Sequence, residues 1–183
     1  MPTSALPGVV VLIGMMGSGK TSVGRALAER TGWRYMDNDE LVRAVTAREP
    51  AEIDATDGEA ALHAAEAAAL RHALAKPPPL IVAAAAWCVQ DPASVELLRA
   101  EPGVVYLRAR PETLHARIGS GRGRRDEATD LEWLRARFNE RDAIYHEIAT
   151  FTIDTDELDV AAVVERIVHE LESVAAASAR VIG

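Results

Sequence analysis

The stretch GMMGSGKT, which runs from Gly14 to Thr21, decides how this chain folds. It reads G-x-x-x-x-G-K-T, the pattern of a phosphate-binding loop. The apolar run VVVLI at 9–13 precedes it and is typical of a strand buried on both faces. After it, apolar residues recur at helical spacing up to Gly32, which suits a helix C-cap. Strand, glycine loop and helix in this order predict a phosphate site rather than a plain turn.

This loop offers several kinds of group to a nucleotide. Its backbone N–H groups are expected to turn inward around phosphate oxygens, at the positive end of a helix. Lys20 is expected to reach the β- and γ-phosphates, and Thr21 to offer its hydroxyl to Mg²⁺. The expected nucleotide-binding residues of the loop are Gly17, Ser18, Gly19, Lys20, Thr21 and Ser22.

Composition restricts the class of protein. The 183 residues suit one domain, and 49% hydrophobic residues are enough for a core. A net charge of −8 argues against general nucleic-acid binding and against an anionic membrane surface. The single Cys88 permits no internal disulfide, and neither a signal peptide nor a membrane span is apparent. We therefore expect a cytoplasmic monomer that binds a small molecule, without nucleic-acid or membrane partners.

Short apolar segments alternate with helical patterns along the chain. Strands are expected at about 8–13, 33–36, 80–84, 103–108 and 150–153. This alternation predicts a mostly parallel sheet with helices on both faces. The long segment at about 39–76, between the second and third strands, is expected to be a helical insertion. The tail after about Glu172 is expected to fray.

Two acids follow the second expected strand, in the stretch YMDND at 35–39. Ligands of open α/β sheets bind at the carboxyl ends of strands, so Asp37 and Asp39 are expected to face the phosphate loop. One acid could hold a Mg²⁺-bound water, and the other could accept a proton from an attacking hydroxyl. The alternative is a pair of capping acids before the next helix. The neighbouring loop favours the functional interpretation.

Arginines and glycines alternate between Arg117 and Arg125. Glycine permits motion, and arginine neutralises charge on a transferring phosphoryl group, so this segment predicts a lid. The alternatives are an exposed basic loop and a nucleic-acid patch, and the acidic overall charge disfavours the patch. Further along, Arg141 is followed by Asp142, and spacing alone favours an ordinary salt bridge between Arg141 and a neighbouring acid.

Taken together, these motifs resemble the shikimate kinase family from about residue 8 to about residue 170. The resemblance implies an α/β fold of the P-loop, nucleoside-monophosphate-kinase-like type: three layers, with a five-stranded parallel sheet. It implies a core at about 8–38, 77–117 and 129–172, a helical substrate-binding insertion at about 39–76 and a lid at about 118–128. It also implies ATP and Mg²⁺, phosphoryl transfer to a ring hydroxyl, and a place in aromatic amino acid biosynthesis.

The resemblance assigns roles residue by residue. The matching features are the loop, DND at 37–39, Gly58-Glu59 with Glu66, VVYL at 104–107, and Arg141 with Tyr145. The implied metal contacts are Thr21 and Asp37. The implied catalytic residues are Lys20, Asp39 and Arg124. The implied nucleotide contacts beyond the loop are Arg117 and Arg124. The implied substrate-binding positions are Asp39, His63, Ala86, Trp87 and Arg141.

The acceptor side departs from the family pattern. The family has Phe-Arg where this chain has Leu62-His63, and a neutral imidazole cannot form a bidentate, charge-assisted pair with a carboxylate. The family has three glycines where this chain has Ala85-Ala86-Trp87, so the added side chains should block or remodel the pocket. Asp54 replaces a phenylalanine, and Arg125-Asp126-Glu127 replaces Pro-Leu-Leu.

These observations favour an ATP-dependent kinase whose acceptor is shikimate or a related hydroxylated ring or polyol. The alternative is a catalytically silent nucleotide-binding paralogue with its acceptor site blocked by Trp87. A GTPase or mechanical ATPase is disfavoured, because the third strand runs into alanines rather than a metal-binding acid. Whether His63 meets an anionic acceptor or packs on its helix remains open.

Overall fold

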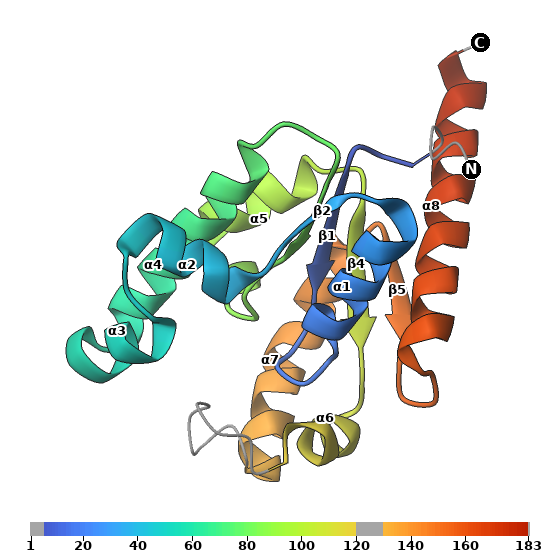
Figure 1. The fold of residues 1–183 in the computed structure, drawn as a ribbon. Helices are drawn as coiled ribbons and strands as arrows, with labels where there is room; N and C mark the ends of the chain where they lie inside the picture. Colours follow the sequence, from blue (N-terminus) through green and yellow to red (C-terminus); the bar gives the residue numbers. More distant parts are fainter. Residues whose placement is uncertain (1–5, 120–129, 183) are drawn as a thin grey trace.

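The computed structural model describes residues 6–119 and 130–182. Its centre is one parallel sheet with the strand order β2-β3-β1-β4-β5 (Figure 1). The strands are β1 (Val9–Ile13), β2 (Arg34–Met36), β3 (Leu80–Ala83), β4 (Val104–Arg108) and β5 (Phe151–Asp154). The five strands expected from the sequence and their parallel arrangement are confirmed.

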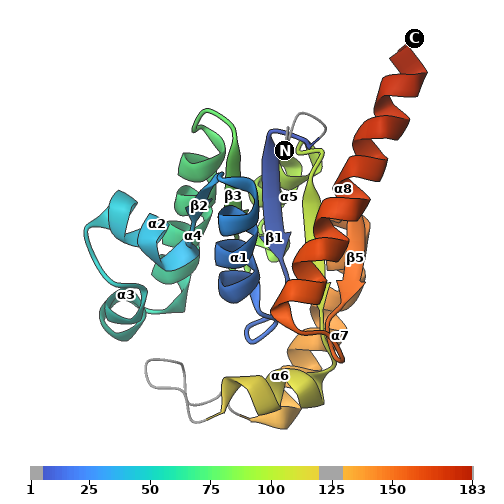
Figure 2. The same cartoon turned by 45° about the vertical axis from the view of Figure 1, so that its right-hand side comes forward.

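Helices cover both faces of this sheet. They are α1 (Lys20–Thr31), α2 (Asn38–Thr46), α3 (Pro50–Asp57), α4 (Glu59–Leu74), α5 (Pro92–Arg99), α6 (Pro111–Ile118), α7 (Leu131–Ile148) and α8 (Val160–Ile182), with a short 3₁₀ helix, η1 (Cys88–Gln90). Figures 1 and 2 show α1 and α8 on one face, and α4, α5 and α7 behind the other. The fold therefore has the three layers that the sequence predicted.

The side chains of β1 alternate between the two faces of the sheet, and this alternation explains the layers. Val10 and Leu12 pack into the cluster that contains side chains of α1 and α8. Val11 and Ile13 pack into the opposite cluster, with side chains of α4 and α7. Successive side chains of a strand point to opposite faces, so a strand covered on both sides is apolar at every position. This is why the run before the phosphate loop is unbroken.

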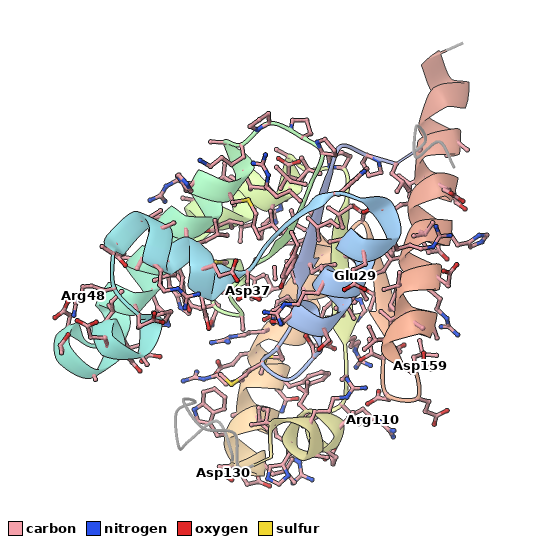
Figure 3. The ribbon with its side chains drawn as sticks, viewed as in Figure 1. Glu29, Asp37, Arg48, Arg110, Asp130 and Asp159 are labelled. Atoms are coloured by element: carbon pink, nitrogen blue, oxygen red, sulfur yellow. The ribbon has the colours of Figure 1, made fainter. Side chains whose placement is uncertain are left out.

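Three helices, α2, α3 and α4, fill the long segment between β2 and β3. Pro50 begins α3, and Gly58 separates α3 from α4 with a φ of 87°. Arg48 forms ion pairs with Glu52 and Asp57, which tie α3 to the turn before it. In Figure 3, Asp37 lies near the middle of the molecule and Arg48 lies at the outer end of these helices.

The C-terminal helix differs from the sequence expectation. We expected fraying after about Glu172, but α8 continues to Ile182. Alanine has the highest helix propensity, and the run Ala175-Ala176-Ala177 continues the helix beyond the core residue Leu171. Among the described helices, none combines the length and the apolar character needed to cross a membrane.

Candidate active site

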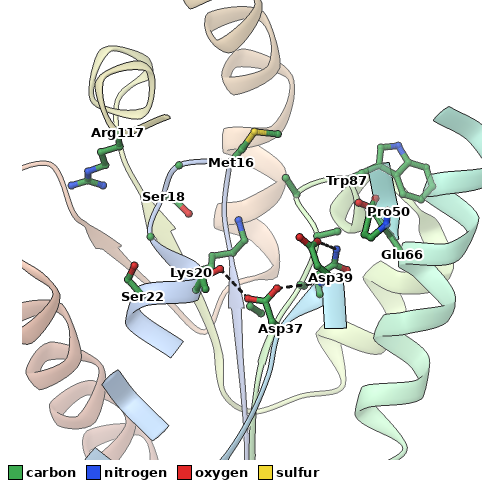
Figure 4. A pocket seen from close by; sticks show the side chains of 18 of the residues that line it. Met16, Ser18, Lys20, Ser22, Asp37, Asp39, Pro50, Glu66, Trp87 and Arg117 are labelled. Carbon is green, nitrogen blue, oxygen red and sulfur yellow. Dashed lines mark hydrogen bonds between the residues drawn. The ribbon is translucent and has the colours of Figure 1, made fainter. Parts of the chain in front are cut away.

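A cleft of about 980 Å³ opens where the first three strands of the sheet end. Its lining comes from the phosphate loop, from the start of α2, from α3 and α4, and from α7. Because the carboxyl ends of parallel strands meet at one edge of the sheet, side chains distant in sequence converge there. Figure 4 shows Arg117 on one side of this cleft and Trp87 on the other.

The phosphate loop has the backbone of an anion cradle. Gly14 and Gly17 have φ values of 145° and 81°. A Cβ on Gly14 would lie 2.6 Å from the carbonyl oxygen of Leu107, and one on Gly17 would lie 2.8 Å from a side-chain carbon of Ile118. Both conformation and space therefore require glycine at these two positions. Directly after the loop α1 begins, so its N-terminal N–H groups face the cleft.

Two polar side chains of the loop fit a phosphate ligand. The Ser18 side chain is buried, and its Oγ has no hydrogen-bond partner within the described part of the chain. A buried hydroxyl without a partner costs free energy, and a phosphate oxygen would supply one. The Lys20 ammonium donates to the carbonyl oxygens of Gly14 and Met15, at 2.8 and 3.0 Å, so it lies across the loop.

The two acids after β2 are held differently. Asp37 caps α2, since its Oδ1 accepts the backbone N–H of Asp39 at 3.2 Å. The other oxygen of Asp37 accepts the Thr21 hydroxyl at 2.9 Å (Figure 4). Asp37 therefore both caps α2 and contacts the phosphate loop, so these two roles are not alternatives. Asp39, in the first turn of α2, lines the cleft beside it.

A hydroxyl and a carboxylate in contact suit Mg²⁺, which keeps several waters and needs only one or two protein ligands. Thr21 and Asp37 form such a pair next to the loop. Within the described ranges, no cluster of three or more His, Cys, Asp or Glu residues could hold a metal ion. The donor set thus fits a magnesium ion that shares its coordination sphere with phosphates, rather than a cage made by the protein alone.

The sequence analysis missed Tyr35 as part of this site. The Tyr35 hydroxyl donates to Asp37 Oδ2 at 2.7 Å. Burial and the nearby Asp37 raise the pKa of the Tyr35 hydroxyl, so it stays protonated as a donor. The available signal was spacing, because residues two apart on a strand share a face. Tyr35 therefore helps to fix the carboxylate that meets Thr21.

Gly24 in α1 makes room for the Tyr35 ring. A Cβ on Gly24 would lie 2.2 Å from Cε2 of Tyr35. Gly→Ala inside a helix normally stabilises a protein by about 1 kcal/mol, but here the ring would have to move away from Asp37. We expect Gly24→Ala to lower the free energy of unfolding by about 1–3 kcal/mol, measured by urea denaturation. In a Tyr35→Ala background the same change should be neutral or stabilising; stabilisation by Gly24→Ala alone would contradict this packing.

Arg117 lies at the end of the cleft opposite Trp87. Its guanidinium donates to the hydroxyl of Thr155, at 2.9 Å, and to the carbonyl oxygen of the same residue. Thr155 is buried, and the apolar residues Leu158 and Val163 continue this wall. Apolar lining residues beside an oriented guanidinium suit a nucleobase, because guanidinium planes stack on aromatic rings.

The end of the cleft at Trp87 contains an aromatic stack. The imidazole of His63 lies flat on the indole of Trp87, with ring centroids 4.1 Å apart and planes 8° apart. His63 Nε2 is 3.6 Å from a carboxylate oxygen of Glu59, and its side chain is only 19% exposed. Trp87 has φ −78° and ψ −23°, an ordinary right-handed conformation that needs no glycine. Trp87 is therefore accommodated without backbone strain, and it is one of the residues that line the cleft.

Arg141 corrects one expectation from spacing. It forms no salt bridge with Asp142, which pairs instead with Arg108 at 2.9 Å. Consecutive residues of a helix point in different directions, so neighbours in sequence do not meet on its surface. Arg141 is only 7% exposed, and its Nε donates to the Gln90 side-chain oxygen at 2.8 Å. In the part of the chain that the structure describes, no carboxylate lies within 4.0 Å of its guanidinium.

The structure thus brings most of the expected site residues to one cleft. Those that line it are Gly17, Ser18, Gly19, Lys20, Thr21, Ser22, Asp37, Asp39, His63, Ala86, Trp87, Arg117 and Arg141. The lid expected at 118–128 falls mainly on residues 120–129, outside the described residues, and with it Arg122, Arg124 and Arg125. Cleft residues that sequence reasoning did not single out include Trp133 and Arg137.

Comparison with known proteins decides the family. The family model for shikimate kinase matches residues 16–172. The chain belongs to the shikimate kinase family. Among curated members, it is 37% identical to the shikimate kinase of Chromobacterium violaceum over 171 residues, covering 91% of each chain. It is 36% identical to that of Moorella thermoacetica over 176 residues, covering 92% of this chain and 96% of the relative.

A solved member of the shikimate kinase family has the same fold. The structure of shikimate kinase from Acinetobacter baumannii in complex with shikimate aligns with a TM-score of 0.82 and 28% identity. The alignment covers 92% of this chain and 94% of that chain. The similarity to the shikimate kinase family therefore extends over nearly the whole chain.

Proposed function

We propose that this chain is an ATP-dependent kinase that transfers the γ-phosphoryl group of ATP to a hydroxyl of shikimate or a closely related hydroxylated ring. One observation carries the proposal: the phosphate loop with its Thr21–Asp37 pair and the buried cation Arg141 line the same cleft. A phosphoryl donor and an anionic acceptor would meet there, and membership of the shikimate kinase family supports both partners.

On the nucleotide side, the loop N–H groups, the Ser18 hydroxyl and the Lys20 ammonium would hold the phosphates. Thr21 and Asp37 would hold Mg²⁺, and Arg117 would meet the base. When bound, the metal neutralises the charge that develops on the phosphates. Because the protein's groups are fixed in place before the reaction, they stabilise that charge without reorganising. Arg124 and the lid at 118–128 stay predictions from the sequence.

On the acceptor side, Asp39 would accept the proton of the attacking hydroxyl as the oxygen–phosphorus bond forms. Asp39 lines the cleft beside the Thr21–Asp37 pair, a position that would bring its carboxylate near the phosphoryl group to be transferred. Arg141, held by Gln90, would bind the acceptor at the far wall. The open cleft beside Trp87 supports catalysis rather than a blocked, silent site.

The test is acceptor-dependent turnover. The purified protein is mixed with ATP, Mg²⁺ and one acceptor at a time: shikimate, other hydroxylated ring acids, neutral cyclitols or sugars. ADP release is followed with a coupled assay, and the phosphorylated product is identified by mass spectrometry. We expect phosphorylation of shikimate or a related ring acid. Nucleotide binding without turnover on any of these acceptors would contradict the proposal and favour a silent paralogue.

The contacts of His63 lead to a prediction about pH. Its ring is stacked on Trp87 and faces Glu59, so we expect acceptor binding to depend on Arg141 rather than on the imidazole. Guanidinium groups do not titrate near neutral pH. Shikimate affinity, measured by calorimetry, should be flat between about pH 5.5 and 8, a range that spans the ordinary histidine pKa of about 6.5. Tighter binding at low pH that disappears in His63→Gln would show instead that the imidazolium binds the acceptor.

A further inference from the structure

We propose that Arg137 on α7 joins Arg141 in binding the carboxylate of the acceptor, and that Gln90 orients Arg141. This inference rests on the proposed function, because it assumes a hydroxylated acceptor that carries a carboxylate. The family resemblance points to Arg141 alone. Arg137 and Gln90 are assigned here from their positions and contacts in this structure.

The two arginines share one face of α7. They are four residues apart, and residues at this spacing are neighbours on a helix surface, with Cβ atoms about 5–6 Å apart. Both line the cleft. Two guanidinium groups on one wall offer a carboxylate more donors than one arginine does, and charge-assisted hydrogen bonds of this kind are the strong ones.

The surroundings of Arg141 suit the binding of an anion. Its side chain is buried, and its Nε–H is directed to the neutral oxygen of Gln90 rather than to an acid. A buried cation is costly when no anion compensates it, and a ligand carboxylate would provide that compensation. The hydrogen bond from Nε also fixes the plane of the guanidinium. Gln90 is thus a positioning residue, which acts through Arg141.

Arg137 is available to join it. Its guanidinium pairs with Glu140 at 2.8 Å, but the two side chains are 34% and 47% exposed. Exposed ion pairs of this kind contribute little to stability, so exchanging Glu140 for a ligand carboxylate costs little. The guanidinium lies 5.5 Å from the ring centroid of Trp133, another cleft residue, and this contact keeps it at the wall.

Among the described residues that line the cleft, α3 and α4 contribute acids rather than an arginine: Asp54, Glu59 and Glu66. On α4, His63 is stacked on Trp87, at the position where the family has an arginine. The lost arginine at position 63 is therefore replaced from a different helix.

The test compares shikimate with its methyl ester, which lacks the negative charge and carries one additional methyl group. Binding of each is measured by calorimetry to the wild-type protein, to Arg137→Gln and to Arg135→Gln. Arg135 is a matched control: it is on the same helix, pairs with Glu112 and Glu132, and is not among the cleft residues. We expect Arg137→Gln to weaken shikimate binding roughly 10- to 100-fold, the usual worth of a charge-assisted hydrogen bond, and to leave ester binding unchanged. Arg135→Gln should change neither.

Gln90→Leu should also reduce the preference for the acid over the ester, with a smaller effect. Equal losses for acid and ester in Arg137→Gln, no acid preference in the wild type, or no binding of either compound would each overturn the inference.

Measuring turnover distinguishes a failure of this inference from a failure of the proposed function. Phosphorylation of shikimate without an effect of Arg137 on acid preference rejects only the arginine pair. Acid-selective binding that needs Arg137, without turnover, rejects only the kinase.

Discussion

The Asp39→Asn enzyme is expected to lose acceptor-dependent turnover by about 10²- to 10⁴-fold, the usual contribution of a general base. Asparagine has nearly the same shape as aspartate but cannot take the proton of the attacking hydroxyl. The Asp39 side chain accepts a 3.3 Å hydrogen bond from the neighbouring Asn38, which asparagine can also accept, so the substitution should disturb the fold little. The measurement is kcat with the best acceptor of the panel.

Nucleotide binding is the internal control for this variant. ATP affinity should change little, because Thr21 and Asp37 remain in place. Glu40→Gln removes the same charge from the same helical turn, at an exposed residue that is not among those lining the cleft, and should keep wild-type turnover. Turnover of Asp39→Asn within a few fold of the wild type would reject Asp39 as the base.

Lys20→Met is expected to lower kcat by about 10²- to 10³-fold, as the loss of one preorganised donor to a developing charge does, and to weaken ATP binding. The ammonium of Lys20 is held over the loop by two carbonyl oxygens, close to where the phosphates would lie. Methionine has a similar length and no charge. The measurements are kcat by the coupled assay and ATP affinity by calorimetry.

The chain offers a matched control, because its only other lysine is Lys76, which follows α4 and is not a cleft residue. Lys76→Met should leave both quantities unchanged. Since Lys20 also contacts the loop backbone, the free energy of unfolding of each variant is measured alongside. A fully folded Lys20→Met enzyme with normal ATP affinity and normal turnover would contradict the assigned role.

The fold could be predicted from the sequence because the patterns that indicate it lie within short stretches of the chain. An unbroken apolar run before a glycine loop can be satisfied only by a buried strand, and the observed β1 has both faces covered. The loop pattern fixes the start of α1 in the same way. The pair Asp37 and Asp39 was predictable for a topological reason, since β2 must end at the edge where the loop lies.

The contacts that shape the acceptor end were not predictable in this way. Arg141 meets Gln90, 51 residues away, and Trp87 meets His63 from another element. Such pairs depend on how helices pack, and nothing in the local pattern specifies it. Spacing alone even favoured the wrong partner for Arg141. The effect of Trp87 on the pocket also required its backbone conformation, which a count of replaced glycines does not give.

The missing methyl group at Gly24 has a consequence for the divergence of this chain. The Tyr35 ring occupies the space that a side chain at position 24 would need, and its hydroxyl holds Asp37. A substitution at position 24 or at position 35 therefore affects the packing of the other residue. An ancestor that acquired tyrosine before losing the side chain at 24, or the reverse, would have passed through a poorly packed intermediate, so we expect the two residues to have been inherited as a linked pair.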